Sequence, residues 1–450
     1  MNAFFPAILL TYLQPFRQLF SKPCFDYFKA FIWAMMIIES KKTITNISYA
    51  CFFLKKHIAS YERFLSEYIW DMNQLTNILI RLIINVLKNK LYIHGAFLIA
   101  IDTTHKAKAS KKMIGVQKWK KNDNQNNYIT GHHWTIVGLI SRFANRFICY
   151  PVMARMISGL NNPSHFVCSS EGVYPMTFWD TILAVILQAR QFLENFNFRV
   201  VVDAYFANST FINPMIDQGI HVVTRWRKDG VGWDAPQPHH GKRKRGRPKK
   251  YGIQYKLSNL FNTFTPEYTL VHIYGQLSHV ALTTRDMYLR DIKQKVRVVV
   301  VDSNEDPIIL VSTDLTLSPA EIIEIYSSRF SIEIAIRELK QHFGFGDYQS
   351  TTPLSIIRFV NLSCISLCLC SLMLFQQNVF KQNIFKQSIF NCLSHGLLQE
   401  SEFKSEFSFT RVRRGLRRFI LEHIIFHNSA DNAELEKMAK QYEPIFRIIA

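Results

Sequence analysis

The 450-residue sequence has few acidic side chains for its many basic ones. It holds 34 Asp and Glu against 54 Lys and Arg, which gives a formal net charge of +20. Such a chain attracts polyanions, so nucleic acid is the first partner to expect and an anionic membrane surface the second. An AT-rich gene, with its frequent Lys, Asn, Ile and Phe, would account for some of this excess. Because 48% of the residues are hydrophobic, a compositionally disordered chain is excluded.

Zinc-ligand spacings and membrane-length apolar runs are also lacking. The eight cysteines are not paired as in zinc sites, and three of them, Cys364, Cys368 and Cys370, are placed as buried thiols would be. The most apolar segment, residues 359–375, is interrupted by Asn361 and is shorter than the roughly 20 residues that span a bilayer. The N-terminus lacks the basic region of a signal peptide. We therefore expect a buried core helix at 359–375, no membrane insertion and no requirement for an oxidising compartment.

Helical and strand-like patterns succeed one another along the chain. Residues 1–90 have helical spacing, and their Lys55-Lys56 pair leaves open either a helix-turn-helix or a packing domain. Apolar runs then predict strands and intervening helices, at 96–104, 128–141, 146–156, 177–196 (helix), 198–219 (strand, turn and helix) and 220–227. This order is typical of a mixed α/β layer. Short strands between 268 and 314 indicate a β-rich insertion that returns to the core near 307, and the C-terminal stretch is helical and basic.

One predicted helix, "YSSRFSIEIAIRELK" (326–340), carries a polar stripe beside an apolar one. At about 100° per residue, five polar side chains fall within an arc of about 80°: Tyr326, Arg329, Glu333, Arg337 and Lys340. The neighbouring arc is apolar, as a core-facing stripe would be: Ile325, Ile332, Ile336, Leu339 and Phe343. A capping box at Ser318 and Glu321 predicts where the helical region begins.

Three carboxylates stand where α/β proteins form sites. Asp102 ends one apolar strand, Asp203 ends another, and Glu333 lies within the striped helix. Together they would repel one another unless a cation neutralised them, and Mg²⁺ or Mn²⁺ suits carboxylate oxygens. Two such ions about 3.5–4 Å apart can activate water and stabilise the leaving oxygen of a phosphoryl displacement. Taken singly, each aspartate can merely cap the following turn, and Glu333 can merely pair with Arg329 or Arg337.

The spacing on the striped helix resembles a family signature. Y-x2-R-x3-E-x6-K surrounds the last acid of DDE transposases in the fourth group of bacterial insertion sequences, and it stands here as Tyr326, Arg329, Glu333 and Lys340. "FLIAIDTT" and "VVVDAYFANSTFINPMIDQGIHVVTRWRKDG" resemble the segments of that family's first and second aspartates. "GKRKRGRPKKYG" and "ILVSTDLTLSPAEIIEIYSSRF" resemble stretches of its members described as DDE superfamily endonucleases. The resemblance covers about 95–375 and, more weakly, the helical N-terminus, and Phe330 replaces the Trp of many members.

The fold that this resemblance implies is α/β, with an RNase H-like mixed-sheet catalytic core interrupted by a β-rich insertion and flanked by helical N-terminal and C-terminal regions. The corresponding segments would be a helical DNA-binding domain at 1–90, the first core segment at 91–228, the basic loop and insertion at 229–306, the second core segment at 307–376 and a helical region at 377–450.

The resemblance also implies roles for individual residues. Asp102, Asp203 and Glu333 would be catalytic and would bind two Mg²⁺ (or Mn²⁺) ions, so that water nicks the element's end and the freed 3′-OH attacks a second strand. Arg329 and Lys340 would hold DNA phosphates and Tyr326 would position one. Arg337 joins this group from its place in the stripe alone.

The expected partner is double-stranded DNA, both the element's terminal inverted repeats and the target, bound by a homodimer in the cytoplasm at the bacterial nucleoid. Two other functions stay open. One is a non-catalytic DNA-binding protein derived from a transposase, and the other is an RNase H-like endonuclease without strand transfer. A membrane-surface protein is a more remote alternative.

The basic loop "GKRKRGRPKKYG" contains the Arg-Gly-Arg-Pro core of an AT-hook. Its cations would contact DNA either in a narrow minor groove or as a phosphate-binding loop: Arg245, Arg247 and Lys249. Four further side chains are ambiguous. His132 and His133 can be ligands but are expected to pack, and Tyr205 or Phe206 can stack on a flipped base but are expected in the core.

Overall fold

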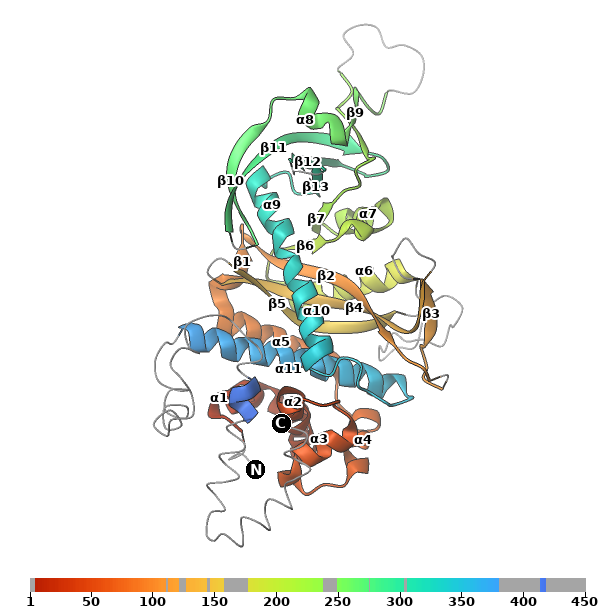
Figure 1. Cartoon of the computed structure of the whole chain (residues 1–450), viewed down its shortest axis with the longest axis vertical. Coiled ribbons are helices and arrows are strands. Elements are labelled where there is room, and N and C mark those ends of the chain that lie inside the picture. Colours follow the sequence, from red (N-terminus) through yellow and green to blue (C-terminus); the bar gives the residue numbers. More distant parts are fainter. Residues whose placement is uncertain are drawn as a thin grey trace.

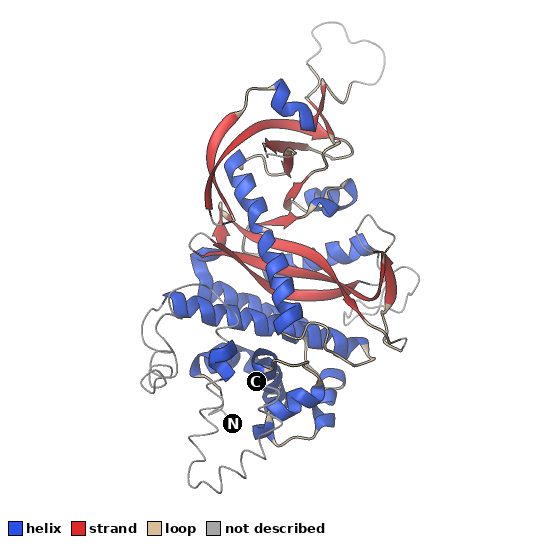
Figure 2. Ribbon diagram, viewed as in Figure 1, coloured by secondary structure: helices blue, strands red, loops and turns tan. Residues whose placement is uncertain are grey.

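The structure of the chain is a computed structural model, which describes residues 5–110, 112–120, 127–143, 146–157, 177–237, 249–274, 276–302, 306–379 and 413–417. Arg245 and Arg247 of the basic loop lie outside the described residues, as does most of the predicted region 377–450. Figures 1 and 2 show helices gathered at one end of the molecule, a twisted sheet across its middle and curved strands at the other end.

All strands of the described residues join one mixed 13-stranded sheet. Ten of them form a continuous path in the order β3-β4-β2-β6-β7-β13-β12-β11-β8-β9, while β1, β5 and β10 pair with β2, β4 and β11. Their bounds are β1 Tyr92–Ile93, β2 Ala96–Ala107, β3 Gln117–Lys120, β4 Tyr128–Phe143, β5 Arg146–Ile157, β6 Phe198–Val202, β7 His221–Arg225, β8 Val231–Trp233, β9 Gln254–Lys256, β10 Glu267–Ile273, β11 Gln276–Leu289, β12 Lys295–Val301 and β13 Ile308–Ser312.

The strands β5-β4-β2-β6-β7 form the portion of the sheet that matters for the site. β5, β4 and β2 are antiparallel neighbours, whereas β6 and β7 run parallel to β2. The three parallel strands carry runs of buried apolar residues, as strands covered on both faces do. The strands predicted at 96–104, 128–141, 146–156 and 220–227 are thereby confirmed.

The strands predicted for the insertion extend this same sheet. β13 pairs antiparallel with β7, and β12 and β11 follow in turn. β10 and β11 form a hairpin whose strands curve past α9 in Figure 1. The β-rich character of this region is therefore confirmed, while its limits at 229 and 306 stay a prediction.

The helices cover both faces of the sheet and fill the N-terminal end. Their bounds are α1 Ala7–Leu13, α2 Lys22–Ile37, α3 Ile44–Ala50, α4 Ile58–Ser66, α5 Met72–Leu87, α6 Phe178–Phe192, α7 Ser209–Asp217, α8 Leu260–Thr263, α9 Pro319–Ser328, α10 Phe330–His342 and α11 Pro353–Val379. Short 3₁₀ turns occur at Gln14–Leu19 (η2), Phe52–Leu54 (η3), Lys88–Leu91 (η4), Ala204–Phe206 (η5) and Leu257–Asn259 (η6). The helical character predicted for residues 1–90 is confirmed, but its role in DNA binding stays a prediction.

The predicted core helix at 359–375 is confirmed as a section of α11. Pro353–Phe375 is long and apolar enough to cross a membrane, yet its most apolar window is completely buried inside the protein. α11 packs between β5 on one side and α2 and α4 on the other (Figure 1). Its thiols at Cys364, Cys368 and Cys370 are buried, as their apolar setting predicts. The helix therefore joins the N-terminal helices to the sheet.

The striped helix is divided in two, which corrects the expectation of a single helix over 326–340. α9 ends at Ser328 and α10 begins at Phe330, while Arg329 between them keeps helical dihedrals of φ −55° and ψ −35°. The Arg329 N–H donates to the carbonyl of Tyr326, three residues back, so the turn is tightened there. The predicted capping box is confirmed, because Ser318 and Glu321 satisfy each other's backbone N–H groups at the start of α9.

A buried lysine beside the end of α10 leads to a testable pH dependence. Lys42 is 2% exposed, and its side chain lies against Gly344, where φ is +76° and a Cβ would approach the lysine Cδ to 2.5 Å. Burial and the nearby Arg413 lower the pKa of Lys42 to about 8, although Asp347 opposes them. The unfolded chain then binds more protons than the folded one between pH 8 and the ordinary lysine range, so stability rises with pH in that window.

Replacing Lys42 with Met is expected to raise the free energy of unfolding at pH 7 by about 1–3 kcal/mol, since the desolvated charge is removed and the apolar stem is kept. The advantage over the wild type should shrink as the pH rises from about 8 to 10. Urea unfolding of both proteins across this range measures it. A difference that stays constant with pH would show that Lys42 is not buried in charged form.

Candidate active site

The two aspartates stand side by side at one edge of the parallel strands. Ala100 of β2 is opposite Val201 of β6, so Asp102 and Asp203, each two residues further on, continue the same register. Asp102 lies within β2 beyond its pairing with β6, and Asp203 directly follows β6. Adjacent strands are about 4.8 Å apart, so the two carboxylates share one small region.

Local hydrogen bonds hold both aspartates. Asp102 accepts from the Thr103 N–H at 2.7 Å, and Asp203 accepts from the Tyr205 N–H at 3.0 Å, which caps the turn η5. The Thr224 hydroxyl of β7 donates to the Asp203 carbonyl at 2.8 Å. The capping role predicted as the simpler alternative is thus present for Asp203. Each aspartate uses one carboxylate oxygen in these bonds and keeps the other for further partners.

Arg329 connects the third acid to this edge. One guanidinium nitrogen donates to Glu333 Oε1 at 2.5 Å, and another lies 4.0 Å from Asp102 Oδ2. The Arg329 side chain is 14% exposed, whereas Glu333 keeps 42% of its side chain open to solvent. The Nε of Arg329 is buried and has no hydrogen-bond partner among the described residues. The salt bridge predicted as the simpler role of Glu333 is therefore formed.

The charges of these groups act on one another. Burial raises the pKa of Asp102 to about 6, and the charges of Asp203 and Glu333 add to this effect while Arg329 opposes it. Burial also raises the pKa of Asp203, against the opposing charge of Arg329. Burial acts to lower the pKa of Arg329, but the hydrogen bond to Glu333 outweighs burial, and the pKa is raised. Three acids and one cation therefore form a single electrostatic group.

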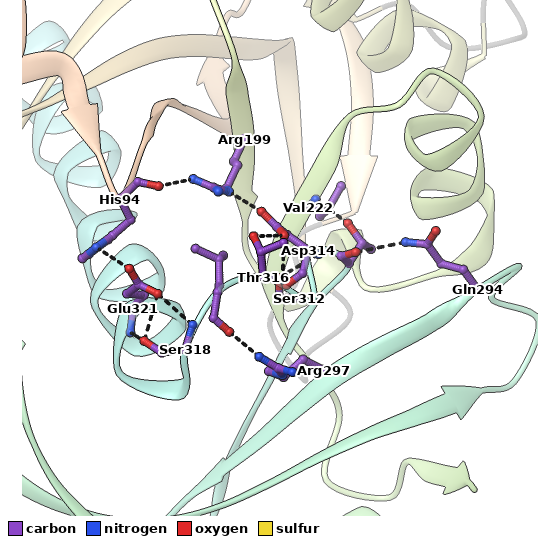
Figure 3. Close-up of polar contacts among 12 residues, drawn as sticks. His94, Arg199, Val222, Gln294, Arg297, Ser312, Asp314, Thr316, Ser318 and Glu321 are labelled. Carbon is purple, nitrogen blue, oxygen red and sulfur yellow. Dashed lines mark hydrogen bonds and ion pairs between the residues drawn. The ribbon is translucent and has the colours of Figure 1, made fainter. Parts of the chain in front are cut away.

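A polar network holds the start of α9 in place (Figure 3). Because α10 follows α9 directly, the network also helps to position Glu333. Arg199 of β6 donates to Asp314 at 2.8 Å and to the His94 carbonyl at 2.8 Å. The His94 ring lies 3.1 Å from Glu321 and 2.8 Å from Glu324, both on α9. Burial would raise the pKa of Asp314, but hydrogen bonds from Thr316 and Arg199 hold it at about 2. The loop from β13 to α9 is thus tied to the same strand that ends at Asp203.

The two stripes of the helix are arranged as predicted. All five apolar residues, Ile325, Ile332, Ile336, Leu339 and Phe343, are buried. On the polar side, the partly buried Tyr326 ring lies 5.8 Å from the Arg329 guanidinium carbon, whereas Arg337 and Lys340 are exposed. Arg337 is 4.0 Å from Glu338, which gives it no link to the acids. The structure therefore brings together Asp102, Asp203, Glu333 and Arg329, with Tyr326 beside them and Lys340 further along α10.

The donor set fits a hard divalent cation. Asp102, Asp203 and Glu333 offer only carboxylate oxygen, which Mg²⁺ and Mn²⁺ prefer. Within the described ranges no three His, Cys, Asp or Glu side chains are close enough to hold one ion as they stand, because Glu333 is turned to Arg329. The Nε of Arg329 is buried and has no hydrogen-bond partner among the described residues, so this guanidinium has a donor to spare. The assignment of a metal to these acids stays a prediction.

The remaining predicted residues are placed as follows. His132 is buried and bonds to the Tyr348 hydroxyl at 2.8 Å and the Ile114 carbonyl at 2.9 Å, and His133 stacks on His105 with ring centroids 4.0 Å apart. Both therefore pack, as expected. Phe206 is buried in the core as expected, but the same expectation is wrong for Tyr205, which is 49% exposed and stacks on Trp179. Lys249 is exposed, at the edge of the undescribed stretch of the basic loop.

One basic residue close to the site was not among the predictions. Lys106 lies on β2 four residues beyond Asp102, on the same face of the strand. The two-residue alternation of strand faces would have placed Lys106 on the face of Asp102, if the strand had been expected to continue to residue 107.

Comparison with known proteins gives one family match. Residues 15–271 match the family of DDE superfamily endonucleases, a range that includes both aspartates and ends before Glu333. No curated protein matches the chain. Among solved structures, a piggyBac transposase in a synaptic complex with hairpin DNA aligns at 9% identity and a TM-score of 0.37, covering 97% of this chain and 83% of its own. The NurA nuclease from Sulfolobus solfataricus aligns at 10% identity and a TM-score of 0.22, covering 63% and 97%.

Neither structural likeness is close enough to support an argument, but the family match does not depend on them. It covers more than half of the sequence, and it includes the strands that carry the first two acids. The chain therefore belongs to the DDE superfamily endonuclease family.

Proposed function

We propose that this protein is a DNA transposase that cuts the ends of an insertion sequence and joins them to target DNA. The observation that carries the proposal is the meeting of Asp102 and Asp203, in register on neighbouring parallel strands, with Glu333 and Arg329 of the α9–α10 segment. Membership of the DDE superfamily endonucleases supports it. The order and directions of β5-β4-β2-β6-β7, three antiparallel strands followed by two parallel ones, support an RNase H-like core with β8 to β12 as its insertion.

Each residue would have a distinct role in the reaction. Asp102, Asp203 and Glu333 would hold the divalent ions, Mg²⁺ or Mn²⁺ and two in number, that DDE endonucleases use to activate water and to stabilise the leaving oxygen. Arg329 would give up its bond to Glu333 and turn its fork of donors to a DNA phosphate. Tyr326 would orient a phosphate through its hydroxyl, and Lys340 would hold a neighbouring one. The Arg329–Glu333 pair would keep the acids in place until DNA arrives.

The partners would be the element's terminal repeats and a target duplex, bound by two copies of the chain. The net charge of +20 and the exposed cations Arg337, Lys340 and Lys249 favour a polyanionic substrate. The decisive experiment incubates the protein and Mg²⁺ with a labelled duplex that carries the DNA flanking its gene, together with a target plasmid. Cleavage followed by joined product is expected from the wild type and neither from Asp203→Ala.

The other results have definite meanings. Binding without cleavage by the wild type would favour a non-catalytic DNA-binding protein. Cleavage without any joined product would favour an endonuclease that lacks strand transfer. Cleavage that survives Asp203→Ala would contradict the assignment of the site.

A further inference from the structure

Two basic residues extend the acidic site, one along β2 and one along α10. On β2, Lys106 lies four residues beyond Asp102 and on the same face, with buried Thr104 between them. On α10, Lys340 lies seven residues, or about two turns, beyond Glu333. α10 packs across β2 (Figure 1). The strand and the helix each carry an acid and, further along, a lysine.

The two lysines lie close enough for the charge of one to act on the other. The surrounding protein and the charge of Lys106 lower the pKa of Lys340, while Asp102 opposes them. Neither lysine forms an ion pair with any residue that the structure describes. The two ammonium groups thus act on each other, and neither is neutralised by an ion pair with a described carboxylate.

The loop after α10 holds Lys106 in this position. Gly346 has a φ of +115°, and a Cβ there would come within 2.3 Å of the Lys106 Cε and 2.5 Å of its Cδ. The lysine stem therefore lies along a groove that only glycine leaves open. Lys108, two residues further along, is different. Its ammonium donates to the Gly346 and Tyr348 carbonyls at 2.7 Å each and covers the Tyr348 ring, so its donors serve the loop.

We propose that Lys106 and Lys340 together hold one phosphate of the DNA backbone a few phosphates from the bond that is cut. The proposal rests on the function proposed above. Four residues of strand span about 13 Å and seven of helix about 10 Å, which places both lysines away from the reacting phosphate and beside a later one of the same backbone. Two unpaired ammonium groups at that distance from the acids fit a single negatively charged group that bridges them.

The first test measures how the affinity for a duplex of arbitrary sequence depends on salt, for the wild type, Lys106→Met, Lys340→Met and the double variant. The double variant is expected to reduce the slope of log K against log salt by about 1, because one phosphate is no longer neutralised. Each single variant should lose less than the double variant, since the remaining lysine still faces the same phosphate. Lys106→Arg should keep the wild-type slope, and thermal unfolding confirms that each variant is folded.

Lys90→Met is the matched control, because Lys90 is exposed on η4, before β2 begins. It should leave the slope unchanged. An unchanged slope in the double variant would overturn the proposal, and a loss of about 2 in the double variant would overturn the shared phosphate. These measurements need no cleavage, so a wild type that binds but does not cut would contradict the proposed function and leave the phosphate site standing.

A second test locates the phosphate on a substrate that is cut. Single methylphosphonates, which are neutral, are placed one at a time on either side of the cleaved bond. One a few positions away should weaken binding by the wild type, and it should not weaken binding further in the variant that lacks both lysines. If the methylphosphonate and the lysine substitutions weakened binding additively at every position, the assignment would be contradicted.

Discussion

Replacing Glu333 with Gln is expected to reduce the rate of DNA cleavage by about 10³-fold or more. A carboxylate that holds a catalytic cation supplies several kcal/mol of transition-state stabilisation, and about 1.4 kcal/mol corresponds to each factor of ten. Glutamine has nearly the same size and can still accept a hydrogen bond from Arg329, so the joint between α9 and α10 should persist. Single-turnover cleavage under saturating protein measures the effect.

Binding separates this explanation from a structural one. Glu333→Gln removes a negative charge that faces the DNA backbone, so its affinity for a duplex should be no weaker than that of the wild type. Glu338→Gln is the matched control on the same helix, because Glu338 lies beside Arg337 and His342 rather than beside the aspartates. The family match ends before this helix, so Glu333 is the acid for which the measurement matters most. Cleavage within tenfold of the wild type would remove it from the site.

Replacing Arg358 with Ala is expected to lower the free energy of unfolding by about 3–5 kcal/mol, in the range of other losses of a buried charged group's partners. Arg358 of α11 is 5% exposed. Its guanidinium donates to the carbonyls of Leu65, Tyr68 and Trp70 and lies 4.1 Å from the centre of the Trp70 ring. Alanine would leave these carbonyls without their donor and would open a cavity beneath the ring.

Denaturant unfolding of the variant provides the measurement. Arg358→Lys should lie between the wild type and Arg358→Ala, since a lysine keeps the charge but cannot reach three carbonyls with a planar fork. Arg63→Ala on the exposed side of α4 should change stability by no more than about 0.5 kcal/mol. A loss below about 1 kcal/mol for Arg358→Ala would mean that the N-terminal helices are not held to α11 in this way.

Features that depend on neighbouring residues were predictable from the sequence. The apolar run before Asp102 defines β2, the runs before Asp203 and after Gly219 define β6 and β7, and the pair Ser318 and Glu321 marks the start of α9. The stripe on 326–340 also indicated the correct buried side, because five apolar residues repeat at helical spacing.

Features that depend on distant residues were not. The break at Arg329 involves neither glycine nor proline, and the residue keeps helical dihedrals, so nothing in the local pattern marks it. The pairing of β13 with β7 joins segments that are far apart in the sequence, and the charge of Lys106 acts on Lys340 only because α10 crosses β2. Whether Glu333 forms a salt bridge or binds a metal also depends on where Asp102 lies, and helical periodicity gives no information about that position.

The most direct test of the central claim, that Asp102, Asp203 and Glu333 form one cleavage centre, is a cycle of single and double variants. Single-turnover cleavage is measured for Asp102→Asn, Asp203→Asn and Glu333→Gln and for each pair of them. If the acids act as a unit, each single variant loses about 10³-fold or more, and each double variant is little worse than the single ones. The account would be contradicted if the loss of cleavage rate in a double variant equalled the product of the two single losses. It would also be contradicted by a single variant that cuts within tenfold of the wild type.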